Sequence, residues 1–169
     1  MTNQSPEKST NEQELSNLVR MAQEQAKVVL RKLPLLGPMT WLMLQRGGTR
    51  NILLSELEWR VLPALALDQV RLHMREEAPI AFITWAKLSA AAAGRYREPP
   101  HQLSPSDWKS GEDVWIIDVI APFGGAAEAI QDLKEKVFPG QVLRQLSPSP
   151  EGLAKVLKWK SETRRQEQA

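Results

Sequence analysis

Apolar residues recur at helical intervals through the first part of the chain. They predict an amphipathic helix over residues 11–33, about six turns long. Pro34 is expected to end this helix, because the residue before a proline is pushed out of the helical region. The apolar positions are Leu15, Leu18, Val19, Ala22, Ala26, Val29, Leu30 and Leu33.

The rest of the chain alternates between extended and helical patterns. Val70–Met74 and Ile80–Trp85 predict a hairpin, and the continuous apolar run Val114–Ile120 predicts a buried strand. The other expected elements are helices at 39–44, 55–65, 86–95 and 126–138, a polar loop at 98–111, and closing strands at 141–146 and 153–159. This order predicts an α+β fold, with a central sheet flanked by helices.

The length of 169 residues suits one domain with a core of its own. We expect a disordered tail at 1–10, the amphipathic helix at 11–33, one domain at 34–160 and a flexible tail at 161–169. The six tryptophans should lie mostly in the core or in a groove, and Trp41, Trp85 and Trp115 are expected in the core.

Composition excludes several kinds of site. The chain has no cysteine, so disulfides and thiol nucleophiles are absent. His73 and His101 are the only histidines and lie far apart in sequence, so no metal site is expected. The net charge of +2 argues against nucleic-acid binding. No apolar run is long enough to span a membrane, and the polar N-terminus predicts a cytoplasmic protein.

The stretch from Trp115 to Gly124 carries the strongest chemical signal. Asp118 stands alone among apolar residues, where a carboxylate is costly to bury unless it is paired or performs chemistry. Gly124 and Gly125 follow and lead into a predicted helix, so their backbone N–H groups could approach a ligand. We therefore expect Asp118 to face a groove beside a glycine-rich turn.

Three blocks of sequence together span roughly residues 37–146. The blocks are Gly37 with Trp41-Leu42 and Arg50-Asn51; Val61-Leu62-Pro63-Ala64 with Gln69, Pro79-Ile80-Ala81 and Trp85-Ala86-Lys87-Leu88-Ser89; and Asp107-Trp108-Lys109-Ser110-Gly111 with Trp115-Ile116-Ile117-Asp118 and Ile120-Ala121-Pro122-Phe123-Gly124. With these blocks the chain resembles the toxin-activating lysine acyltransferases, the proteins that fatty-acylate RTX protoxins such as haemolysin.

The resemblance implies a fold similar to the GNAT acyltransferases, with a mostly antiparallel sheet, often as a homodimer. It implies that no cofactor is bound, and that acyl carrier protein with its phosphopantetheine arm donates the acyl group. The acceptor would be an internal lysine of a protein similar to an RTX protoxin. The N-terminal amphipathic helix is longer than the family usually has.

The family uses an aspartate and a histidine as its essential pair. The aspartate corresponds to Asp118, and Thr49 stands at the position of the histidine. A threonine hydroxyl is no useful base at neutral pH. Three alternatives remain: Asp118 works with an ordered water, His73 or His101 enters the site from elsewhere, or the chain is a catalytically inactive relative that binds the carrier or a protein client.

Further residues are expected to bind the acyl arm or the carrier. Arg50 could meet a phosphate or the acidic carrier surface, or could instead pair with Asp118. Gly124 and Gly125 could bind the arm or the thioester oxygen, or form a simple strand-to-helix turn. An unrelated binding module whose N-terminal helix docks a partner is a third class of function.

Overall fold

The structure is a computed structural model and describes residues 6–149 and 152–160. A five-stranded sheet with the order β1-β2-β3-β4-β5 forms its centre. Neighbouring strands are antiparallel except for β3 and β4, which are parallel, so the mostly antiparallel α+β fold is confirmed. The strands are β1 (Val70–Arg75), β2 (Ala78–Leu88), β3 (Asp113–Ile120), β4 (Leu143–Ser149) and β5 (Gly152–Trp159).

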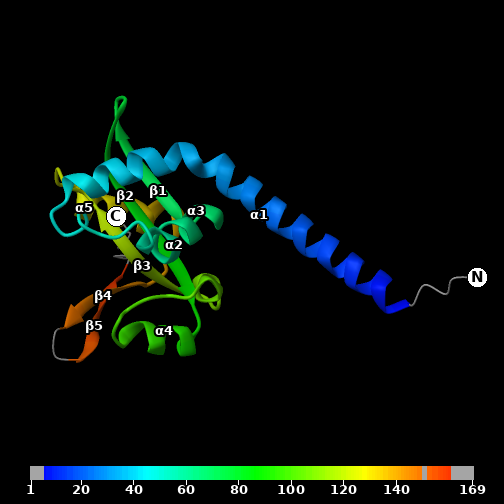
Figure 1. The fold of residues 1–169 in the computed structure, drawn as a ribbon. Coiled ribbons are helices and arrows are strands. Elements are labelled where there is room, and N and C mark those ends of the chain that lie inside the picture. The colour runs from blue at the N-terminus through cyan, green and yellow to red at the C-terminus, as the bar shows by residue number, and fades with distance from the viewer. Residues whose placement is uncertain (1–5, 150–151, 161–169) are drawn as a thin grey trace, which may run out of the picture.

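Helices cover both faces of the sheet, as Figure 1 shows. The end of α1 (Pro6–Gln45) packs with α3 (Leu62–Ala66) against Phe82 and Ile120 on one face. On the other face, α5 (Ala126–Asp132) and the π-helix that follows it pack against Ile83 and Ile116. Successive residues of β2 therefore point into different cores, as the period of two in a strand requires.

The helix α1 is longer than the sequence predicts. It runs without a break through Pro34 and Pro38, so the expected stop at Pro34 is wrong. A proline inside a helix costs about 3 kcal/mol. The turns that follow bury Met39, Leu42 and Met43, with 0%, 0% and 3% of their surface exposed, and each buried side chain contributes about 1.5–3 kcal/mol. Packing against the sheet therefore offsets the two prolines.

The first part of α1 extends well beyond the domain (Figure 1). Its apolar side chains are solvent-exposed there, with Leu15 and Leu18 both 63% exposed. The expected flexible tail at 161–169 lies outside the described residues. Within the described ranges, no helix is both long and apolar enough to cross a membrane.

Two predicted helices have different bounds in the structure. The helix expected at 55–65 is divided at Val61 into α2 (Glu56–Arg60) and α3, which places Pro63 in the first turn of α3, where a proline is tolerated. The helix expected at 86–95 begins only at Ala90 and forms α4 (Ala90–Arg97), because Ala86–Leu88 continue β2 and the Ser89 hydroxyl caps the Ala92 N–H.

Of the three tryptophans expected in the core, Trp85 and Trp115 are buried. Trp41 is not: 43% of its surface is exposed, and it packs against Phe123 with ring centroids 5.7 Å apart. The prediction for Trp41 was wrong because its side of α1 meets the turn after β3 rather than the sheet. That contact joins α1 to the glycine-rich turn.

Candidate active site

A cavity of about 510 Å³ opens beside the end of β3. Its walls come from α2, from the loop after α4, from β3 and from β4. Asp118 lies in its wall, as the sequence predicts, and only 6% of that residue is exposed. The lining residues used below are Arg46, Glu56, Trp59, Arg60, Tyr96, His101, Asp118 and Gln145.

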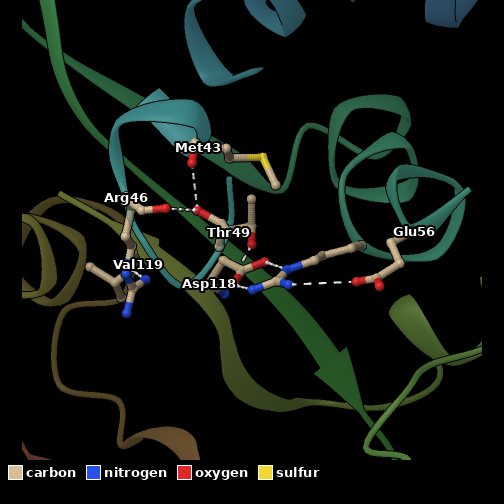
Figure 2. Close-up of polar contacts among 8 residues, drawn as sticks. Met43, Arg46, Thr49, Glu56, Asp118 and Val119 are labelled. Atoms are coloured by element: carbon tan, nitrogen blue, oxygen red, sulfur yellow. Dashed lines mark hydrogen bonds and ion pairs between the residues drawn. The ribbon is translucent and has the colours of Figure 1, made fainter. Parts of the chain in front are cut away.

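Asp118 forms a bidentate ion pair with Arg60, the last residue of α2. The Arg60 Nε donates to Oδ2 at 2.6 Å and Nη2 donates to Oδ1 at 2.5 Å. The Asp118 backbone N–H donates to the Thr84 hydroxyl at 3.2 Å, which holds β3 against β2 (Figure 2). Arg60 therefore pairs with Asp118, and not Arg50, which the sequence left open as an alternative partner. Arg60 reaches the carboxylate from the helix that covers this part of the sheet.

The pair shapes the electrostatics of the cavity. The hydrogen bond to Asp118 raises the pKa of Arg60 above its ordinary value, against the opposing effect of burial. Burial, reinforced by the negative charge of Asp118, raises the pKa of the Tyr96 hydroxyl. Around neutral pH the cavity therefore holds a fixed guanidinium cation and a protonated phenol beside the carboxylate.

Thr49 is buried, but its hydroxyl is bound to the main chain. It donates to the Met43 carbonyl at 2.7 Å and lies 3.4 Å from the Arg46 carbonyl (Figure 2). Thr49 lines a separate cavity of about 140 Å³, which Arg50 also lines, and neither residue lines the cavity of Asp118. The hydroxyl of Thr49 therefore stabilises the turn after α1.

The side chain of Arg46 connects that turn to β3. Its Nη1 donates to the Val119 carbonyl at 2.9 Å, one residue beyond Asp118, and Arg46 lines the same cavity (Figure 2). Gly124 and Gly125 lie outside the cavity wall and have φ angles of 90° and 91°. The Gly124 N–H already donates to the Ala121 carbonyl at 3.2 Å. Their place in carrier binding stays a prediction.

Sequence reasoning missed most of the cavity wall. Arg60, Glu56 and Tyr96 carry no motif, and a partner for Asp118 could not be chosen among 22 lysines and arginines. Of the two histidines considered as replacements, His101 lines the cavity. His73 lies on β1 outside the cavity wall, and burial lowers its pKa.

The described ranges contain no cluster of three or more acidic, histidine or cysteine side chains that could hold a metal ion. Several side chains that can donate hydrogen bonds line the cavity, among them the guanidinium groups of Arg46 and Arg60 and the phenol of Tyr96. Such a set suits a substrate with carbonyl or phosphate oxygens.

Comparison with known proteins defines the class of this protein. Residues 28–160 match the model of the RTX toxin acyltransferase family. The chain is 34% identical over 124 residues to the RTX-II toxin-activating lysine-acyltransferase of Actinobacillus pleuropneumoniae. The aligned residues are 72% of this chain and 77% of that protein. It is 39% identical over 112 residues to the leukotoxin-activating lysine-acyltransferase of Aggregatibacter actinomycetemcomitans, with 66% of each chain covered.

A third relative is the protein-lysine myristoyltransferase of Escherichia coli. It is 33% identical over 120 residues, which are 71% of this chain and 70% of that protein. Such identities over most of the chain identify an acyltransferase. The chain belongs to the RTX toxin acyltransferase family.

Proposed function

We propose that this protein transfers a fatty acyl group from acyl carrier protein to an internal lysine of a protein acceptor similar to an RTX protoxin. The observation that carries the proposal is the cavity of about 510 Å³ at Asp118, within the residues that match the family. Two of the relatives named above are toxin-activating lysine-acyltransferases and the third is a protein-lysine myristoyltransferase, which supports a protein-lysine acceptor. The reaction would take place in the cytoplasm, without a bound cofactor.

Arg60 supports this chemistry because its guanidinium has N–H donors that Asp118 does not use. A guanidinium has five N–H donors, and Asp118 accepts from two of them. Up to three remain for other acceptors, and Glu56 comes no closer to the guanidinium than 4.0 Å. They can bind a thioester oxygen as it gains negative charge, or a phosphate of the carrier arm. In this proposal Asp118 is a positioning residue that holds Arg60 at the cavity wall.

The direct test is incubation of the protein with acyl-loaded carrier and a protoxin, followed by mass spectrometry of the protoxin. We expect a mass increase of one acyl group on a lysine. Acyl coenzyme A in place of the loaded carrier should give little transfer. Transfer from coenzyme A alone would contradict the carrier as donor.

A second candidate, a catalytically inactive relative that binds the carrier or a client, is favoured by one observation. Arg60 engages both carboxylate oxygens of Asp118, and Thr49 supplies no base. The same incubation separates the two candidates. A complex with the loaded carrier that leaves every lysine unmodified would favour the inactive relative.

Carrier binding should depend on salt. Acyl carrier proteins are acidic, this chain has a net charge of +2, and Arg50 is exposed beside the turn that follows α1. We expect the Kd to rise roughly tenfold between low and high salt, because surface charges are screened beyond about 8 Å at physiological ionic strength. Calorimetric titration measures both values.

A matched pair of variants locates the carrier surface. Arg50→Glu and Lys158→Glu change the net charge equally, and both side chains are exposed, but Lys158 lies on β5. Only Arg50→Glu is expected to weaken binding strongly. Equal losses would show that net charge alone attracts the carrier.

The proposal also includes a homodimer formed through α1. Leu15, Leu18 and Val19 lie at helical spacing, and all are exposed. The acidic Glu12 and Glu14 precede them, and the basic Arg31 follows, while Lys32 is already paired with Asp68. An antiparallel pair of helices would bury the apolar stripe and bring acidic ends against basic ends, as a two-fold interface requires.

Deletion of residues 1–27 tests the dimer and spares the residues that match the family. We expect light scattering to give a dimer mass for the full chain and a monomer mass for the truncated one. The unfolding midpoint should change little, because the core contacts of α1 begin near Leu35. Equal masses for the two chains would contradict the dimer.

A further inference from the structure

We propose that His101 is the general base of this enzyme, in place of the histidine that Thr49 does not supply. The inference rests on the proposed function. His101 belongs to the loop after α4 and lines the same cavity as Asp118 and Arg60. The sequence does not place His101 beside Asp118, because 17 positions separate the two residues and no motif joins them.

The loop holds His101 in a defined position. Its backbone N–H donates to the Glu98 carbonyl at 2.9 Å, and its φ angle of 60° is in the left-handed region. Histidine, asparagine and aspartate adopt this region several-fold more often than the other non-glycine residues. His101 is half-buried and lines the cavity.

A single hydrogen bond assigns the tautomer of the ring. The Nδ1 of His101 lies 3.1 Å from the Tyr96 carbonyl oxygen. A carbonyl oxygen can only accept, so Nδ1 carries the hydrogen in this contact. The neutral ring then has its lone pair on Nε2, which is the atom that can take a proton. The Tyr96 backbone therefore has the orienting role that a carboxylate often has for a catalytic histidine.

The other basic groups of the cavity are less suited to this role. Asp118 is engaged at both oxygens by Arg60. Glu56 lies 4.0 Å from the same guanidinium, so its carboxylate is also directed at Arg60. One nitrogen of an imidazole can accept a proton while the other keeps its hydrogen bond, which suits proton transfer in both directions. His101 is thus the group that can serve as base and then as acid.

The proposed step balances as follows. The neutral amine of the acceptor lysine attacks the thioester carbonyl carbon, and a C–N bond forms. The nitrogen then gives one proton to Nε2 of His101, while the donors of Arg60 stabilise the negative oxygen. The C–S bond breaks, and the imidazolium returns the proton to the leaving sulfur. The products are an amide and a free thiol, and His101 is neutral again.

The test is His101→Asn, with His73→Asn as the matched control. Asparagine tolerates a positive φ, and its side-chain amide can donate to the Tyr96 carbonyl, so the loop should keep its structure. We expect acyl transfer to fall by about 10², with the Kd for the loaded carrier and the unfolding midpoint unchanged. His73→Asn should transfer at the wild-type rate.

The possible results separate the two proposals. If the wild type transfers and His101→Asn transfers equally well, the role of His101 is overturned and the acyltransferase proposal stands. If Glu56→Gln abolishes transfer and His101→Asn does not, Glu56 is the base. If the wild type never transfers, both proposals fail. Nitrogen NMR of the wild type gives an independent check: hydrogen on Nε2 of neutral His101 would overturn the assigned tautomer and the inference with it.

Discussion

Gly111→Ala is expected to lower the free energy of unfolding by about 3 kcal/mol or more. A Cβ atom at Gly111 would lie 2.5 Å from the Leu88 carbonyl oxygen and 2.5 Å from the Ser89 nitrogen. Both are backbone atoms at the end of β2, so the strand or the loop would have to move, and overpacking of this kind costs about 1–3 kcal/mol even where side chains can yield. Chemical denaturation measures the difference.

Gly94→Ala is the matched control. Gly94 lies inside α4, and a Cβ atom there would meet nothing within 4 Å. The same change should therefore stabilise the protein by about 0.5–1 kcal/mol, the usual gain of alanine over glycine in a helix. Equal effects at Gly94 and Gly111 would contradict the close approach to β2.

The contacts around Gly111 give a structural role to one of the sequence blocks that resemble the family. The Gly111 N–H donates to the Lys87 carbonyl at 3.1 Å, and the Ser110 hydroxyl accepts from the Ser89 N–H at 3.0 Å. Trp108 is fully buried, and Asp107 accepts from Arg95 at 2.6 Å. These hydrogen bonds therefore hold the stretch from Asp107 to Gly111 against the end of β2. None of its residues lines the cavity of Asp118.

Local pattern predicted the sheet well. The hairpin of β1 and β2, the buried strand β3 and the closing strands β4 and β5 all appear near their expected bounds. Alternation and continuous apolar runs are properties of a few neighbouring residues, so a sequence shows them directly. The parallel pairing of β3 with β4 depends on how the chain crosses the sheet, and no local pattern carries that information.

The errors arose where distant residues decide the outcome. Pro34 reads locally as a helix stop, yet the burial of Met39 and Leu42 against the sheet carries α1 past it. Likewise, the isolated Asp118 predicted a groove, but the choice of Arg60 as its partner depends on where α2 lies over the sheet. Sequence alone identified the residue that needs a partner and left the partner open.

Asp118→Asn is expected to have the largest combined effect on stability and activity. The substitution keeps the shape of the side chain but removes the bidentate anion of Arg60, whose side chain is 20% exposed, and leaves only Glu56 at 4.0 Å. Breaking a buried ion pair by removing one partner costs about 3–5 kcal/mol. Release of Arg60 from the cavity wall also removes the proposed donor to the thioester oxygen, so transfer should fall by about 10² or more. Denaturation and the mass-spectrometric transfer assay measure the two losses.

Asp113→Asn is the control on the same strand. Asp113 pairs with Arg144 at 3.0 Å, but 49% of its side chain is exposed, and an exposed pair contributes only about 0–1 kcal/mol. That variant should keep its stability and its transfer rate. If Asp118→Asn loses transfer but keeps its unfolding midpoint, the buried pair contributes little and the carboxylate takes part in the chemistry itself. If Asp118→Asn and the double variant Asp118→Asn with Arg60→Gln lose transfer equally, the two residues act as one unit, as the bidentate geometry requires.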